Sequence, residues 1–478
     1  MSSTSPAFRI EHDLIGDREL SNDVYYGVHT LRAVENFPIT GSPISVYPDL
    51  IRALTSIKKA AALANRDLGL LSPARCAAIG AACDELLAGQ LHEHFVVDVI
   101  QGGAGTSTNM NANEVIANRA LELMGHAKGE FQYLHPNEHV NMGQSTNDVY
   151  PSALRIAMWH GATRLADDLD YLRQAFAAKA EEFKDVLKMG RTQLQDAVPM
   201  TLGQELETHA EMLAEDHLRV LEARALIAEL NMGGTAIGTG ITAHPDYAVR
   251  VIEHLRAITG IDLVNSKNLI EATQDCGGYV HLSGVLKRVA TKLSKTCHDL
   301  RLLSSGPRAG MGEINLPAVQ AGSSIMPGKV NPVIPEVVNQ IAYEVIGNDV
   351  TVTFAAEAGQ LQLNAFEPII AHSIFKSTQH LGAGCRTLAD RCVRGITANV
   401  QHMRDAVTNS IGIVTALNPY IGYANATAVA QAAHASGGSV YAIVLERGLM
   451  TREQLDAVLQ PEILTRPAPL DLAPKRAG

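Results

Sequence analysis

The hydrophobic residues of this chain recur mostly at the three- and four-residue spacing of helices. From Val149 onward the apolar positions follow one another in steps of three, four or seven, at Leu154, Met158, Leu165, Leu169, Leu172, Phe176, Phe183 and Leu187. A helix of that length would reach roughly 55–60 Å. Two shorter stripes, over 206–227 and 282–303, repeat the spacing, whereas the strict alternation typical of strands is scarce. The pattern predicts a mainly α protein in which long helices pack into an elongated bundle.

Clusters of glycine, proline and small polar residues interrupt the helical pattern at 190–199, 231–245 and 304–335. We expect a loop between long helices at each of them. The pattern is more mixed before the first long stripe, and its periods are shorter near the C-terminus. The sequence therefore predicts three domains: a mixed, mainly helical domain over 1–146, a central long-helix bundle over 147–403 and a small helical domain over 404–478.

Composition narrows the function without identifying it. The 478 residues include 39 Lys and Arg against 50 Asp and Glu, a formal net charge of −11, which argues against binding nucleic acid through its phosphates. No run approaches the ~20 apolar residues of a membrane-spanning helix. At the start of the chain acidic residues precede any apolar run, unlike in a secretory signal. The six cysteines include no C-x-x-C pair and are expected to be free thiols of a cytoplasmic protein.

Three segments combine glycines with hydroxyl and amide side chains, and each leads into a helical stretch. The first is GGAGTSTNMNANE at 102–114, the second is NMGQSTND at 141–148, and the third is GSSIMPGKVNP at 322–332. In the third, Asn331 before Pro332 fits an N-cap residue followed by proline at the first helical position. We expect each segment to end at the start of a helix.

Loops of this kind suit a small anion. Helix starts present unpaired N–H groups and the positive end of the helix dipole, glycines let the backbone approach a ligand closely, and Lys329 adds a formal positive charge. Together these features predict a pocket for a small dicarboxylic acid. The alternative is that each loop merely caps its helix, since Ser, Thr and Asn are common caps.

No metal site and no cofactor are expected. His135 and His139 are four residues apart, but Pro136 between them argues against a pair of metal ligands on one helix face. The glycines of 233–240 lack the lysine and the spacing of a phosphate-binding loop. Activation by a divalent ion stays open.

The third segment, GSSIMPGKVNP, resembles the signature of the fumarase/aspartase superfamily, and the other two resemble two further segments that the superfamily shares. The stretch from Arg9 through YYGVHTLR to Phe37, together with GRTQLQDAVP at 190–199, is most similar to the aspartate ammonia-lyase branch. The resemblance runs from about residue 9 into the C-terminal domain. It implies a homotetramer whose central helices merge into one multi-helix core, with each active site formed by loops from three subunits.

The resemblance also implies a reaction, the reversible elimination of ammonia from L-aspartate to give fumarate through an aci-carboxylate intermediate. That intermediate carries two negative charges on one carboxylate, so its donors must act more strongly on it than on the substrate. Ser323 would be the general base. The other implied contacts are Thr106, Ser145, Thr146 and Ser324 with the β-carboxylate, Lys329, Asn331 and Thr192 with the α-carboxylate, and Asn147 with the amino group.

Gln193, which is expected beside the substrate, bears on the choice between sister reactions. Many superfamily members have a histidine there, paired with a glutamate corresponding to Glu336, whereas an amide cannot exchange a proton at ordinary pH. A hydratase must expel hydroxide and needs an acid, but an ammonium leaving group already carries its proton. Gln193 therefore favours an ammonia-lyase and leaves Glu336 a supporting role. The alternatives are a fumarate hydratase of the class II type and a non-catalytic member of the superfamily.

Overall fold

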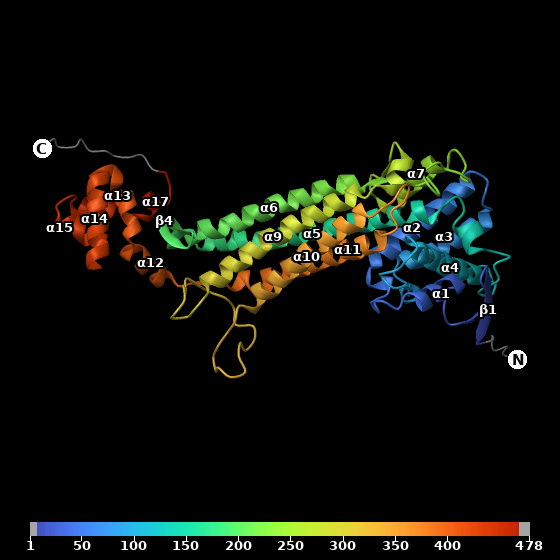
Figure 1. The fold of residues 1–478 in the computed structure, drawn as a ribbon, viewed down its shortest axis with the longest axis horizontal. Coiled ribbons are helices and arrows are strands. Elements are labelled where there is room, and N and C mark those ends of the chain that lie inside the picture. Colours follow the sequence, from blue (N-terminus) through green and yellow to red (C-terminus); the bar gives the residue numbers. More distant parts are fainter. Residues whose placement is uncertain (1–6, 468–478) are drawn as a thin grey trace. The chain divides into compact units, whose positions relative to one another are not determined.

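Helices dominate the computed structural model, which describes residues 7–467 (Figure 1). The mainly α prediction is confirmed. The chain divides into two compact units, the first made of the chain up to Asp167, His217–Thr291 and Ile341–Gly382, the second made of Asp168–Asp216, Lys292–Gln340 and the chain from Ala383 onward. The three domains proposed from the sequence remain a prediction.

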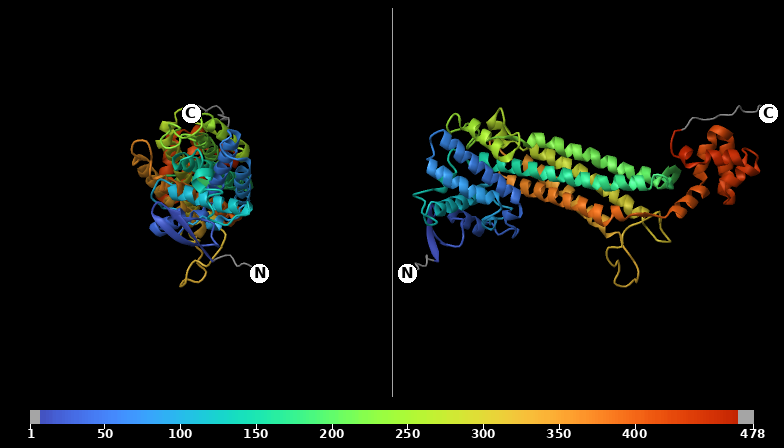
Figure 2. Two further views of the ribbon diagram at one scale, coloured as in Figure 1. Left: turned by 90° about the vertical axis from the view of Figure 1, so that its right-hand side faces the viewer. Right: turned by 180° about the vertical axis from the view of Figure 1, so that it is seen from behind.

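Five long helices form the bundle that the apolar stripes predict (Figures 1 and 2). Within each unit their segments are cross-linked by polar contacts as well as by apolar packing. Arg224 donates to Thr163 over 2.9 Å in the first unit, and Asn339 donates to Ser294 over 3.0 Å in the second. The five are α5 (Thr146–Glu182), α6 (Leu202–Ile227), α9 (Gly277–Leu303), α10 (Val333–Glu357) and α11 (Glu367–Arg391).

The first unit holds the helices that carry the first two glycine-rich segments. α2 (Pro48–Asp67) packs against α3 (Pro73–Leu87) and α7 (Tyr247–Thr259), and α3 packs against α4 (Thr106–Leu123), through fully buried aliphatic side chains. The smaller elements of this unit are β1 (Phe8–Asp13), β2 (Gly16–Ser21), α1 (Val28–Asn36), η1 (Ile44–Val46), η2 (His92–His94), η3 (Pro136–Val140), β5 (Glu229–Leu230), β6 (Val264–Asn265) and α8 (Leu269–Gln274).

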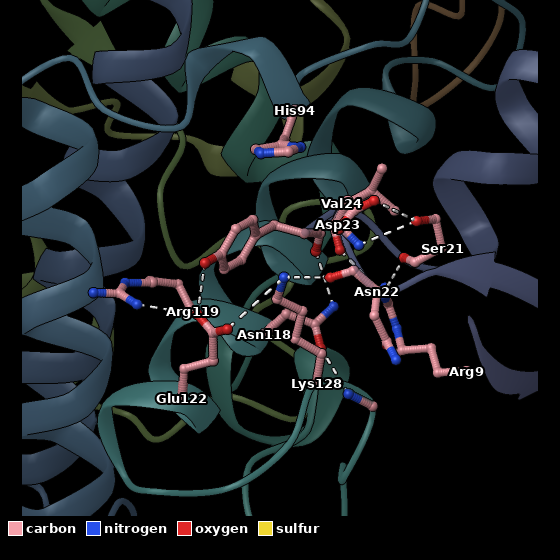
Figure 3. A network of polar contacts seen from close by, with 12 residues as sticks. Arg9, Ser21, Asn22, Asp23, Val24, His94, Asn118, Arg119, Glu122 and Lys128 are labelled. Carbon is pink, nitrogen blue, oxygen red and sulfur yellow. Dashed lines mark hydrogen bonds and ion pairs between the residues drawn. The ribbon is translucent and has the colours of Figure 1, made fainter. Parts of the chain in front are cut away.

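The segment before α1 is tied to α4 by charged groups (Figure 3). Tyr25 donates its hydroxyl hydrogen to Glu122 over 2.6 Å, and the Lys128 ammonium lies 3.8 Å from the centre of the Tyr25 ring. Glu114 on α4 is buried and accepts the backbone N–H of His29 over 2.9 Å. Burial raises the pKa of Glu114 to about 7. These contacts fix the position of α4, whose first residue is Thr106.

The second unit contains the remaining segments of the long helices and a C-terminal helical cluster. Leu417, Val429, Val444 and Leu455 lie in the core of that cluster, and Met189 from β3 packs among them. The elements of this unit are β3 (Leu187–Thr192), β4 (Gln195–Thr201), β7 (Ile314–Asn315), η4 (Val393–Gly395), β8 (Thr397–Ala398), α12 (Val400–Asn409), η5 (Ile411–Ile413), α13 (Val414–Ile421), α14 (Tyr423–Ser436), α15 (Val440–Glu446), α16 (Arg452–Val458) and α17 (Pro461–Leu464).

The prediction of a loop at 190–199 is wrong, because the chain forms an antiparallel hairpin there. β3 and β4 pair from Leu187 with Thr201 to Thr192 with Gln195. The connection at 231–245 is irregular as expected, and so is the one expected at 304–335, apart from the short strand β7 and the start of α10 at Val333.

The prediction of free thiols is confirmed. All six cysteines are free and buried. Between residues 7 and 467, the helices lack the combination of length and apolarity needed to cross a membrane.

Candidate active site

The first segment turns sharply into α4. Gly105 has φ +86°, and a Cβ added there would lie 2.2 Å from the Tyr150 ring, so only glycine fits. Thr106 is the first residue of α4 and its side chain is exposed. The sequence therefore places the Thr106 hydroxyl at a helix start, where the dipole favours an anion.

The second segment is held by a buried carboxylate. Asp148 accepts the backbone N–H of Ser145 over 2.9 Å and those of Gly233 and Thr235 over 3.1 and 3.0 Å. Burial raises the pKa of Asp148 to about 6, and its backbone hydrogen bonds act in the opposite direction. Asp148 thus joins the start of α5 to the 231–245 connection.

The polar side chains of the second segment have defined hydrogen-bond partners. Ser145 Oγ accepts the N–H of Asn147 over 3.2 Å, and Thr146 Oγ1 accepts from the Asn109 amide over 3.1 Å. Asn147 donates its own amide to the Ala236 carbonyl over 2.8 Å. The Asn109 contact brings the first and second segments together, because Asn109 lies on α4 and Thr146 begins α5.

The third segment folds back on itself before α10. The Gly322 N–H donates to the Lys329 carbonyl over 2.8 Å, and Asn331 Nδ2 donates to the Gly322 carbonyl over 2.6 Å. The prediction that Asn331 caps the helix is therefore wrong in detail. The helix begins at Val333 rather than at Pro332, and the Asn331 side chain closes the loop instead.

Ser323 accepts two backbone hydrogen bonds within this loop. Its Oγ lies 3.2 Å from the N–H nitrogen of Ile325 and 2.9 Å from that of Met326. Ser323 is half-buried, whereas Ser324 and Lys329 are exposed. Ser323 and Lys329 line the same open hollow.

Thr192 and Gln193 lie at the tip of the hairpin in the second unit. Gln193 and Leu194 form its two-residue turn with φ +54° and +62°, a conformation that non-glycine residues seldom adopt. The first strand, β3, carries an ion-pair network with the buried Glu313, which contacts Arg191 over 2.6 Å and Lys188 over 2.8 Å. Glu336 is half-buried on the first turn of α10.

The candidate residues fall into two sets. Thr106, Ser145, Thr146 and Asn147 belong to the first unit, and Thr192, Gln193, Ser323, Ser324, Lys329, Asn331 and Glu336 belong to the second. Each set is ordered within its own unit.

Lys58 is a site residue that the sequence does not predict. This lysine is fully buried on α2 and donates to the amide oxygens of Asn109, Asn141 and Gln144 over 2.7, 2.8 and 2.9 Å. The only sequence signal was a lysine on the apolar face of a helix. That signal is ambiguous, because lysine often extends its ammonium from such a face to solvent.

Comparison with known proteins identifies the fold. The family described as "Lyase" matches residues 16–347, which is more than half of the chain. The chain belongs to this family, the fumarase/aspartase superfamily. "Fumarase C C-terminus" matches residues 413–466, within the C-terminal helical cluster.

Relatives match over nearly the full length. The "Aspartate ammonia-lyase" of Helicobacter pylori strain J99 is 60% identical over 459 residues, which cover 96% of this chain and 98% of that protein. The protein of the same name from Escherichia coli K12 is 55% identical over 461 residues, 96% of each. The class II fumarase of Schistosoma mansoni has a TM-score of 0.90 at 33% identity, covering 95% of this chain and 98% of that one.

A further structural relative is the fumarate lyase:delta crystallin from Brucella melitensis bound to cobalt, with a TM-score of 0.94 at 55% identity over 96% of this chain and all of that one. In the described part of this chain, no three or more His, Cys, Asp and Glu side chains are grouped as a metal site would require. His135 Nδ1 accepts the N–H of Asn137 over 3.0 Å, and His139 Nδ1 accepts that of His135 over 2.8 Å.

Proposed function

We propose that this chain is an aspartate ammonia-lyase, which eliminates ammonia reversibly from L-aspartate to give fumarate. The observation that carries the proposal is the identity of 60% and 55% to two curated aspartate ammonia-lyases over 96% of the chain. A cytoplasmic location belongs to the proposal, and the six buried free thiols support it.

The β-carboxylate of the substrate would be bound by Thr106, Ser145, Thr146 and Ser324. Ser145 and Thr146 each use a lone pair to accept a hydrogen bond from the protein. Each hydroxyl therefore keeps its hydrogen for a carboxylate oxygen. Neutral donors at two helix starts suit the dianionic aci-carboxylate, because they stabilise negative charge without a formal cation that would bind the substrate equally well.

Ser323 would remove the proton from Cβ. A serine hydroxyl is a weak acid, so its alkoxide must be stabilised strongly. The two backbone N–H groups that reach Ser323 Oγ support this role, because hydrogen bonds to the charged form favour that form. The exposed Lys329 ammonium on the same loop adds a positive charge.

The remaining contacts would orient the α-carbon. Lys329, Asn331 and Thr192 would bind the α-carboxylate. Asn147 suits the substrate ammonium, because its amide hydrogens serve the Ala236 carbonyl and its oxygen is left as an acceptor. Gln193 would contact the substrate without exchanging a proton, and Glu336 on the first turn of α10 would support the loop.

The active assembly would be a homotetramer in which three subunits contribute to each site. Supporting this, α10 exposes a short apolar stripe, formed by the large side chains of Val350 and Phe354, which lie one helical turn apart. A single chain leaves this stripe in water, whereas a partner helix would bury it.

The proposal is tested by following fumarate absorbance with L-aspartate and, separately, with L-malate. An ammonia-lyase raises the absorbance with aspartate and not with malate. Faster turnover of malate would make the chain a fumarate hydratase. This is the second candidate, and the 33% identity to the Schistosoma fumarase favours it over other activities. If neither substrate is turned over by the purified tetramer, the non-catalytic alternative is correct.

A further inference from the structure

Beneath the second segment lies a buried polar cluster that the proposed chemistry does not use. Lys58 on α2 directs its ammonium at three amide oxygens, those of Asn109, Asn141 and Gln144, all within 2.9 Å. The lysine is 0% exposed and Asn109 is 2% exposed. Burying a charge is costly unless hydrogen bonds compensate for it, so a cluster of this kind needs a reason.

The lysine fixes the orientation of the Asn109 amide. An ammonium group only donates, so the group that faces it over 2.7 Å must be the amide oxygen of Asn109. The NH₂ end of the same amide then faces Thr146 and donates to its Oγ1 over 3.1 Å, and it also donates to the Asn141 amide oxygen over 3.2 Å. Lys58 holds that Asn141 oxygen as well. Without Lys58, therefore, both groups that orient the Asn109 amide are released, and the amide could turn over and present its oxygen to Thr146.

The orientation of Asn109 in turn fixes the Thr146 hydroxyl. Once Oγ1 accepts from Asn109, the hydroxyl hydrogen must point to another acceptor. If Asn109 presented its oxygen instead, that oxygen would take the hydrogen. We propose that Lys58 and Asn109 are positioning residues that keep the Thr146 hydroxyl hydrogen available to the substrate carboxylate. This inference rests on the proposed role of Thr146.

The charge of Lys58 acts in the same direction. Burial lowers the pKa of the Lys58 ammonium to about 7, and the negative charge of Asp148 opposes this. The three amide oxygens also favour the ammonium, because a neutral amine has only two hydrogens to donate. A buried cation behind the donors would stabilise the extra negative charge of the aci-carboxylate.

A double-mutant cycle tests the inference. Thr146→Val and Asn109→Leu are each expected to lower kcat/KM for aspartate by about 10- to 100-fold, the effect of losing a hydrogen bond to a charged group. If Asn109 acts through Thr146, adding Asn109→Leu to Thr146→Val lowers kcat/KM by less than about 2-fold further. Effects that multiply in full would overturn the inference. Lys58→Met, combined with Thr146→Val in the same way, tests the first link of the relay.

Asn111→Leu is the matched control. Asn111 is a fully buried asparagine on the same helix, but it donates to the His94 carbonyl and accepts from the N–H of Val96. Its loss is expected to lower thermal stability while leaving kcat/KM within about 2-fold. An equal loss of kcat/KM in this control would show that the Asn109 effect is merely structural and would also overturn the inference.

The outcomes separate this inference from the proposed function. Wild-type protein that does not turn over aspartate contradicts the function itself. Wild-type activity with an unaffected Thr146→Val variant contradicts the inference and leaves the reaction standing. Should Asn109→Leu not fold, Asn109→Ala takes its place in the cycle, and binding of the dicarboxylate succinate to the Lys58→Met tetramer, measured by calorimetry, decides. Unchanged succinate affinity would overturn the relay.

Discussion

At the scale of single residues, Ser323 is the position on which the proposed chemistry depends most. Its Oγ accepts two backbone N–H groups, but alanine there removes only one oxygen from a half-buried side chain. Ser323→Ala is expected to keep the fold and to lower kcat by about 10²–10⁴-fold, the usual contribution of a general base. Initial rates of fumarate formation measure this, with gel filtration as the control for assembly. Normal turnover would remove Ser323 from its proposed role.

Lys329 is the exposed cation of the same loop, and its proposed partner is the α-carboxylate. That contact exists before and after proton removal, so most of the effect of Lys329 is uniform binding, and the smaller part is the stabilisation of the Ser323 alkoxide. Lys329→Met should raise KM for aspartate by about 10- to 100-fold with a smaller change in kcat. Lys184→Met, which removes another exposed lysine, should leave KM unchanged. A kcat that falls while KM holds would assign Lys329 to the chemical step instead.

At the scale of elements, the signature loop has a backbone that only glycine permits at its first residue. A Cβ on Gly322 would lie 2.6 Å from the Lys329 carbonyl oxygen and 2.8 Å from the Asn331 nitrogen. Gly322→Ala must therefore open the loop and displace Ser323, so activity should fall by at least about 10²-fold while the helices stay folded. Gly80→Ala on α3 has open space around it and should retain activity. Full activity of Gly322→Ala would show that the loop closure is dispensable.

The long helices were predictable from sequence because burial on one face repeats every three or four residues over many turns. The stripe from Val149 to Leu187 predicted α5, although the helix ends at Glu182. The hairpin at 187–201 was missed, since its turn is Gln193-Leu194 and not one of the Asn-Gly or Asp-Gly pairs that announce hairpins. Met189 on β3 packs into the C-terminal cluster and so anchors the hairpin, and sequence spacing does not record such packing.

The same limit applies to the candidate site. Its loops were predictable because glycines and small polar residues are contiguous there. The partners of those loops were not, because Lys58 reaches Asn109 across 51 positions of sequence. Asp148 similarly accepts the N–H groups of Gly233 and Thr235, which lie 85 and 87 positions later in the sequence. Such contacts depend on how helices pack, so they emerge only from the fold.

At the scale of the whole molecule, Glu367 links stability to pH. It begins α11, is buried, and has one carboxyl oxygen without a hydrogen-bond partner. Burial raises its pKa to about 8, and the charge of Arg155 opposes the rise. Tyr150, Cys276 and Tyr279 are the other titratable groups beside it, and burial raises the pKa of each, so they stay neutral.

Because the pKa of Glu367 is higher in the folded protein than in the unfolded chain, the stability of the protein falls as the pH rises. The stability that Glu367 contributes is fully present below its ordinary pKa of 4.5 and is lost as the pH rises through about 8, by at most about 1.4 kcal/mol per pH unit. Glu367→Gln is permanently neutral, so its thermal midpoint should fall less between about pH 5 and about pH 8.5 than that of the wild type. The exposed Glu357→Gln is the control. Parallel curves for wild type and Glu367→Gln would contradict the prediction.

The proposed tetramer predicts that two inactive variants can restore each other's activity, which a site built from a single chain could not show. If Thr146 and Ser323 of one site come from different subunits, a Thr146→Val preparation and a Ser323→Ala preparation should complement each other when they are mixed, dissociated and reassociated. Each site then has an independent chance of about one half of receiving each intact loop, so about one quarter of the sites should regain full activity.

Variants of one loop provide the matched control for this mixing. In a mixture of Ser323→Ala with Lys329→Met every subunit carries a defective third segment, so no assembly can contain an intact site and activity should stay at the level of the separate variants. Hybrid tetramers that form without recovery in the first mixture would show that one subunit supplies both residues. Recovery in the second would show that Ser323 and Lys329 serve different sites. Because a structural scaffold recovers nothing in either mixture, rates measured before and after reassociation test the shared site and the catalytic function together.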